Sequence, residues 1–230
     1  MIASISWLVP HLLPDAMHIP DGFLSLRIAG MAWLLSIAAL GYAVMRTNRQ
    51  LREKQVPLMG VMAAFIFAAQ MLNFPVAGGT SGHLIGGALA AILLGPWASM
   101  LVMTAVVLVQ ALLFQDGGLV ALGANILNMA VIACLVGYYV YAGAHRVLGN
   151  RAWANLASGF SAAWVSVFVA ALSCAVQLGL SGSSPMQIAL PAMGAIHTLI
   201  GVGEGLITVG TLAFITATRP DLVESRPSAK

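Results

Sequence analysis

Charged residues are scarce in this sequence. Asp, Glu, Lys and Arg make up only 7% of its 230 residues, whereas soluble domains carry about a quarter. Apolar residues account for 60% of the chain, and the mean hydropathy is +0.94. A soluble chain of this length could not cover its surface with so few charges. The composition instead predicts an all-α membrane protein, a single bundle without an attached soluble domain.

Three other features are missing. The two cysteines, Cys134 and Cys174, lie inside apolar runs without a CxxC spacing, which argues against a disulfide framework or a zinc site. Because no basic stretch is interleaved with aromatic residues, nucleic acid is not an expected partner. The sequence has no P-loop motif, so the chain is not expected to hydrolyse ATP itself.

Long apolar runs predict the membrane-spanning helices. About 20 mainly apolar residues are needed to cross the hydrocarbon core. The apolar stretch 83–114 would be about 48 Å long as one helix, which is too long for one crossing, and the turn signal at 95–97 divides it in two. Seven spans are therefore expected: 28–45, 57–72, the two halves of 83–114, 119–144, 153–180 and 188–218.

The basic residues predict the orientation of these spans. With seven crossings, nine of the ten basic residues fall on one side, which the positive-inside rule assigns to the cytoplasm. Only Arg27 falls on the other side. The N-terminus is then outside and the C-terminus is cytoplasmic. The outer side receives the connections 17–26, 73–82, 115–118 and 181–186.

Two histidines fall on the outer side and are candidate metal ligands. His18 lies in the N-terminal segment, and His83 is expected to begin a helix directly after a glycine-rich connection. Imidazoles that converge on one water-facing pocket suit nickel, cobalt, copper and zinc. His145, next to Arg146, is instead expected at the inner surface as a solvated residue.

Four segments carry a resemblance to a known family. They are 17–24 (MHIPDGFL), 74–83 (FPVAGGTSGH), 122–130 (LGANILNMA) and 197–205 (HTLIGVGEG). The sequence resembles the cobalt and nickel substrate-binding membrane components of energy-coupling-factor transporters, the CbiM and NikM family. The matches run from residue 17 to about residue 215, which is nearly the whole chain.

The resemblance implies a metal site. By that resemblance the ligands are the α-amine of Met17, the backbone nitrogen and imidazole of His18, and the imidazole of His83. Four nitrogen atoms near one plane suit nickel(II) or copper(II), and also low-spin cobalt(II). The ion, cobalt(II) or nickel(II), would be the transported substrate. The chain would be a binding subunit without catalytic residues.

The resemblance also implies partners and a location. A coupling transmembrane subunit and ATP-binding subunits would supply the energy, with a small accessory membrane protein as a further option. The chain would be a multi-pass protein of the cell (inner) membrane, in contact with lipid. The imported metal would serve cobalamin biosynthesis or nickel enzymes.

Residues 1–16 depart from the family pattern because they would hold the Met17 amine in a peptide bond. They are apolar but lack the positively charged start of a secretory signal. Two explanations stay open: the segment is a leader that is removed, or it is a non-native extension and translation begins at Met17. The expected organisation is an extension at 1–16, a transmembrane metal-binding domain at 17–218 and a polar cytoplasmic tail at 219–230.

Polar residues inside the apolar runs are further candidates. His197 and Glu204 lie seven residues apart on about the same face of the last predicted span. A charge at mid-membrane costs at least about 2.5–3.5 kcal/mol, so Glu204 needs a partner or a water-filled cavity. Two roles stay open for the pair: holding helices together with Asn125 or Asn128, or supporting the metal ligands from beneath. The other pocket candidates are Asp21, Thr80 and Ser81.

Three competing functions account for parts of the sequence. Residues 79–82 fit the pattern GxSG, so Ser81 with His197 could form an intramembrane serine protease, but this leaves segment 17–24 unexplained. A channel or secondary transporter would need buried charges along a through-path, and Glu204 is the one acid deep in a predicted span. A vitamin-binding component of the same transporter class would need more aromatic residues than the 7% present.

Overall fold

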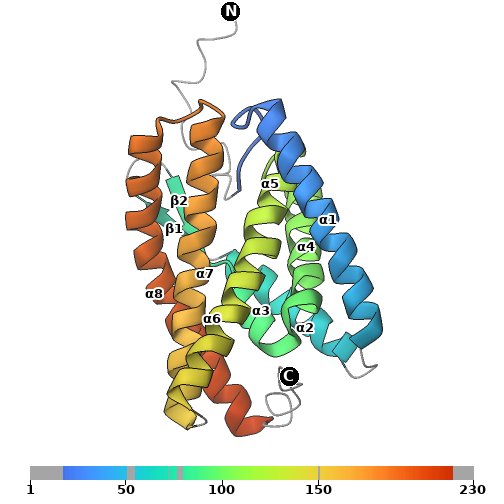
Figure 1. Cartoon of the computed structure of the whole chain (residues 1–230), viewed down its shortest axis with the longest axis vertical. Helices are drawn as coiled ribbons and strands as arrows, with labels where there is room; N and C mark the ends of the chain where they lie inside the picture. The colour runs from blue at the N-terminus through green and yellow to red at the C-terminus, as the bar shows by residue number, and fades with distance from the viewer. Residues whose placement is uncertain (1–17, 51–54, 72, 77–79, 150, 220–230) are drawn as a thin grey trace, which may run out of the picture.

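Helices account for most of the chain from Leu26 onward, and they pack into one bundle (Figure 1). The computed structural model describes residues 18–219, apart from 51–54, 72, 77–79 and 150. The α-helices are α1 (Leu26–Gln50), α2 (Gln55–Gln70), α3 (Gly87–Leu94), α4 (Pro96–Leu113), α5 (Leu122–Ile126), α6 (Ala133–Leu148), α7 (Ala152–Leu180) and α8 (Met186–Thr218). Figure 1 shows α7 and α8 side by side on one flank and α1 on the opposite flank.

A π-helical segment, η1 (Leu127–Ile132), joins α5 to α6, so that residues 122–148 form one continuous apolar helix. π-turns are rare in helices and often occur at functional sites. Here η1 carries Asn128 and Met129, and both line the cavity described below.

Five helices in the described part of the chain are long and apolar enough to cross a membrane: α1, α4, the continuous α5–α6 helix, α7 and α8. Helix α2 has 16 residues. Helix α3 has only 8 residues and is about 12 Å long, which is less than the hydrocarbon thickness. The expectation of a full-length helix in the first half of 83–114 is therefore wrong, and the count of seven crossings stays a prediction.

A two-stranded antiparallel hairpin lies between α2 and α3. Strand β1 (Asn73–Val76) pairs with β2 (Thr80–His83), and Asn73 faces His83 in the register. The expectation that a helix begins at His83 is therefore wrong, because β2 ends there and α3 begins at Gly87. Gly86 explains why α3 begins only at Gly87. Its φ of +79° is left-handed, and a residue with this angle cannot belong to the first turn of a right-handed helix.

Helix α3 is wedged inside the bundle, and all eight of its residues are buried. It meets α6 backbone to backbone, because a Cβ atom added at Gly137 would lie 2.6 Å from the Cα atom of Ala88. Small residues permit such close approach between membrane helices. The packing of α3 fixes where the preceding segment 80–86 must end.

The outer faces of the bundle are apolar. Leu34 on α1 is 71% exposed and Leu199 on α8 is 75% exposed. A soluble protein would avoid exposing such faces to water, whereas lipid accepts them. The surface therefore agrees with the membrane location inferred from composition.

Candidate metal centre

The segment before α1 is held against α5 and the connection that precedes it. The Asn125 side chain pairs with both backbone groups of Ile19: its Oδ1 accepts the N–H at 3.0 Å, and its Nδ2 donates to the carbonyl at 3.1 Å. The Asp21 carboxylate accepts three backbone N–H groups, those of Leu119, Val120 and Ala121, at 3.0, 2.8 and 3.0 Å. These bonds place His18 at the edge of the bundle interior.

His18 is 5% exposed and contacts Asp116 through two nitrogen atoms. Its backbone N–H donates to Asp116 Oδ1 at 3.2 Å. Its Nδ1 lies 3.2 Å from the Asp116 carbonyl oxygen and 3.3 Å from Oδ2. Both neighbours of Nδ1 are oxygen acceptors, so Nδ1 is placed to donate a hydrogen bond. Nε2 is buried and has no hydrogen-bond partner among the described residues.

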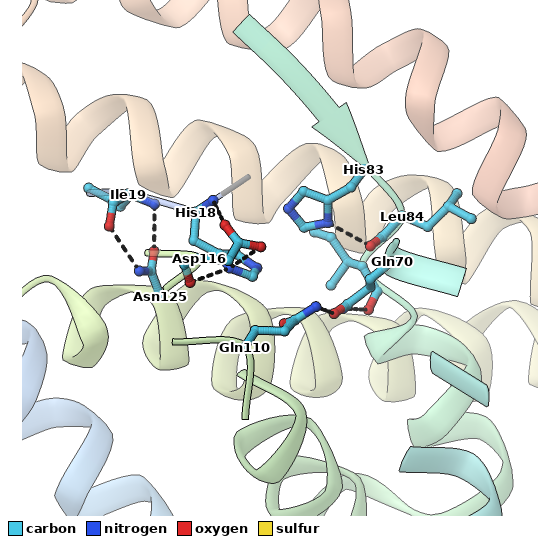
Figure 2. A network of polar contacts seen from close by, with 9 residues as sticks. His18, Ile19, Gln70, His83, Leu84, Gln110, Asp116 and Asn125 are labelled. Carbon is cyan, nitrogen blue, oxygen red and sulfur yellow. Dashed lines mark hydrogen bonds and ion pairs between the residues drawn. The ribbon is translucent and has the colours of Figure 1, made fainter. Parts of the chain in front are cut away.

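His83, at the end of β2, is 8% exposed and lies beside His18. The two ring centroids are 4.9 Å apart and the planes meet at 80° (Figure 2). His83 Nδ1 lies 2.8 Å from the Leu84 carbonyl oxygen, so it donates there and Nε2 is the nitrogen that can bind a metal. The structure thus brings together two of the predicted ligands from distant parts of the chain.

A cavity of about 90 Å³ lies at this histidine pair. Three predicted pocket residues, Asn125, Asn128 and His197, also line it. The remaining lining residues are Ile19, Ile85, Met129, Ala170, Ala171, Cys174 and Met193. Imidazole, thioether and thiol groups are donors for soft and borderline transition metals.

The other predicted residues of the last span do not pair with each other in the structure. His197 Nδ1 donates to the carbonyl of Met193, one turn earlier in α8, at 2.8 Å. Glu204, which is 2% exposed, accepts the backbone N–H groups of Ile85 at 2.6 Å and Gly86 at 2.9 Å. Both residues thus bond to backbone, and Glu204 reaches the segment that follows His83.

Asn128 joins the π-helical segment to α7. Its Nδ2 donates to Gln177 Oε1 at 2.9 Å, and its Oδ1 accepts from Gln177 Nε2 at 2.8 Å and from the Ser173 hydroxyl at 2.8 Å. Asn128 therefore joins two helices through Gln177 and Ser173.

Some predicted site residues lie outside the description. Met17 is outside the described residues, and the side chains of Thr80 and Ser81 are not described either. The backbone of Ser81 pairs with Pro75 in the hairpin, and that of Thr80 pairs with Val76. Within the described ranges there is no group of three or more His, Cys, Asp and Glu residues that could hold a metal ion.

Sequence reasoning missed Asp116. It lies in the predicted outer connection 115–118, where it is the one acidic residue. Its position in an outer connection could have marked Asp116 as a candidate site residue. Its contact with His18, however, arises only in the folded structure. Two buried amides, Gln70 and Gln110, were also missed, although glutamine inside an apolar run is a visible anomaly.

The fold and the site define a class: a multi-pass membrane helical bundle with two buried imidazoles beside a small cavity. Residues 18–222 match the family described as CbiM, cobalt uptake substrate-specific transmembrane region. The chain belongs to this family.

Relatives and solved structures agree with that family. A provisionally named fused nickel transport protein NikMN of Archaeoglobus fulgidus is 49% identical, over 91% of this chain and 69% of that protein. A cobalt transport protein CbiM of Sorangium cellulosum is 32% identical, over 90% of this chain and 95% of that protein. A crystal structure of a transition metal transporter superposes with a TM-score of 0.79 at 34% identity, covering 90% of this chain and 97% of that one.

Proposed function

We propose that this protein is the substrate-binding component of an energy-coupling-factor transporter and captures Co²⁺ or Ni²⁺ from the outer side of the membrane. The observation that carries the proposal is the pair of buried imidazoles, His18 and His83, with ring centroids 4.9 Å apart. Relatives are named nickel and cobalt transport proteins, which supports these two ions as the substrate.

The size of the cavity supports an ion as the substrate. Pockets for small organic molecules enclose about 300–1,000 Å³. The cavity beside the histidines measures about 90 Å³, which is below that range. Its size therefore favours an ion over a vitamin as the substrate.

We propose four nitrogen ligands for the ion: the Met17 α-amine, the His18 backbone nitrogen, the His18 imidazole and the His83 imidazole. Only Nδ1 of His18 can join its own amide nitrogen in a six-membered chelate ring. Both of these atoms donate to Asp116 in the structure. Metal binding through them must therefore displace the Asp116 contacts.

The ligand set requires Met17 to be the functional N-terminus. We propose that residues 1–16 are absent from the active protein. The energy for transport would come from a coupling transmembrane subunit and ATP-binding subunits. Fused relatives, whose names combine two transport components, support an assembly of several parts.

The test joins N-terminal mass spectrometry with elemental analysis of the same purified sample. We expect a chain that starts at Met17 and holds about one cobalt or nickel per protein, lost in His18→Ala and in His83→Ala. His145→Ala is the matched control, because His145 lies in the last turn of α6, outside the cavity. A chain that starts at Met1 and still binds metal stoichiometrically would refute the amine ligand. A chain that starts at Met17 and binds no metal would refute the function.

A further inference from the structure

The peptide groups that follow His83 are held by side chains from two distant helices. Glu204 of α8 accepts the N–H of Ile85 at Oε2, 2.6 Å away, and the N–H of Gly86 at Oε1, 2.9 Å away. Gln70 of α2 donates from Nε2 to the Ile85 carbonyl at 2.6 Å. Side chains thus satisfy both backbone polar groups of Ile85. We call Glu204, Gln70 and the peptide groups of Ile85 and Gly86 the Glu204 clamp.

The Glu204 clamp is buried and extends to a third helix. Glu204 is 2% exposed and Gln70 is 0% exposed. Gln110 of α4 donates from Nε2 to Gln70 Oε1 at 2.9 Å (Figure 2). The low polarity of the surroundings strengthens hydrogen bonds such as these. The Glu204 side chain also bonds to Gly86, the residue just before α3.

One peptide group, which links Leu84 to Ile85, connects Glu204 to the metal ligand: its N–H donates to Glu204 and its carbonyl faces His83. The Leu84 carbonyl, next to the clamped Ile85, accepts Nδ1–H of His83 at 2.8 Å. That bond sets the tautomer and the orientation of the ring, and so the direction in which Nε2 points. Leu84 and Ile85 are buried, so this short segment has little room to move independently.

We propose that Glu204 is a positioning residue for the metal ligand His83. The carboxylate on α8 holds the peptide groups of Ile85 and Gly86, and these hold the imidazole that completes the site. The inference rests on the proposed function.

The test uses Cu²⁺ as a probe on the purified protein whose N-terminal residue is Met17. Copper(II) accepts the same nitrogen ligands, and its electron paramagnetic resonance spectrum reports how many nitrogen atoms are bound. We expect Glu204→Gln to lose the contribution of one imidazole, so that its spectrum matches that of His83→Ala. We also expect its copper affinity to fall about tenfold or more. Gln70→Ala, which releases the Ile85 carbonyl, should show the same change to a smaller extent.

Gln177→Ala is the matched control, because it also removes a buried amide that bonds across two helices. Gln177 contacts Asn128 and Ser173 rather than the segment after His83. The number of nitrogen atoms bound to Cu²⁺ in Gln177→Ala should equal the number in the wild-type protein. A general loss of packing would alter both variants alike, so an equal change in Gln177→Ala would refute a specific role for Glu204.

A second measurement does not depend on metal. Hydrogen exchange at one of the two amides, Ile85 or Gly86, should be about tenfold or more faster in Glu204→Gln, because the amide side chain replaces one accepting oxygen with an NH₂ group that cannot accept. Unchanged exchange, or a Glu204→Gln protein with the wild-type nitrogen count and affinity, would overturn the clamp. A wild-type protein that binds no copper would refute the proposed function, and the exchange rates would still decide whether the clamp exists.

Discussion

At the scale of single residues, three histidines around the cavity share one arrangement. His18, His83 and His197 each place Nδ1 against an oxygen atom, of Asp116, Leu84 and Met193 respectively. A nitrogen beside an oxygen acceptor is placed to donate a hydrogen bond, which leaves the lone pair of a neutral ring on Nε2. His83 and His197 are thereby prepared to bind a cation. His18 is not, because the proposed chelate needs its Nδ1 and its backbone nitrogen.

The His18 arrangement leads to a prediction about pH. If the backbone nitrogen and the Met17 amine are ligands, binding releases the amide proton at every pH, and the amine proton below its ordinary pKa of about 8. The affinity for Ni²⁺ should then rise about tenfold or more per pH unit between pH 7.5 and 8.5. Imidazoles alone would give little change there, because their ordinary pKa is about 6.5.

Competition titrations with Ni²⁺ at about pH 6.5, 7.5 and 8.5 measure this slope. The sign is fixed: protons compete with the metal, so the affinity falls as the pH falls. His145→Ala should keep the wild-type slope, because His145 is not among the cavity residues. An affinity for Ni²⁺ that does not change above pH 7.5 would contradict the amine and the amide as ligands. The two imidazoles would then be the ligands.

At the scale of elements, the sequence predicted some features and not others. Length and hydropathy were sufficient to locate α1, α4, α7 and α8. They failed at α3, because an apolar run buried inside protein has the same composition as one that faces lipid. The contact between Asp116 and His18 could not be predicted either, since it joins positions 98 residues apart. The histidine pair was predictable because both residues fell on one side of the membrane.

The packing of α3 on α6 leads to a second prediction. A Cβ atom added at Gly137 would lie 2.6 Å from the Cα atom of Ala88, and a backbone atom cannot move aside as a side-chain end can. Gly137→Ala should therefore destabilise the protein by about 1–3 kcal/mol. Because α3 directly follows the Leu84–Gly86 segment, the same change should also weaken metal binding.

Gly143→Ala, in the same helix, is the matched control. A Cβ atom there has no neighbour within 4 Å. Replacing a helical glycine by alanine usually stabilises by about 0.5–1 kcal/mol, so this variant should match or exceed the wild type. Thermal unfolding in detergent would compare the two. Equal melting temperatures for Gly137→Ala and Gly143→Ala would contradict the close approach of α3 and α6.

At the scale of the whole molecule, the predicted orientation depends on whether the region of the short helix α3 crosses the membrane. The basic residues after α1 and those between α6 and α7 share one side only if the chain crosses the membrane between α2 and α4. Figure 1 shows the C-terminal ends of α1, α6 and α8 at the same end of the bundle. The segment 18–25 and the connection between α7 and α8 lie at the opposite end. This arrangement agrees with the charge pattern, in which basic residues gather on one side.

Labelling of introduced cysteines in whole cells tests the orientation, after Cys134 and Cys174 are replaced by alanine. The positive-inside rule places Ser184 outside and both Asn48 and Arg151 in the cytoplasm. A membrane-impermeant maleimide should therefore label Ser184→Cys in intact cells, and Asn48→Cys and Arg151→Cys only after permeabilisation. Labelling of Asn48→Cys but not Arg151→Cys in intact cells would mean that the α3 region does not cross. Labelling of both Asn48→Cys and Arg151→Cys in intact cells, without labelling of Ser184→Cys, would mean that the protein has the opposite orientation. The histidine pair would then lie on the cytoplasmic side. Capture of an ion from outside would then be impossible.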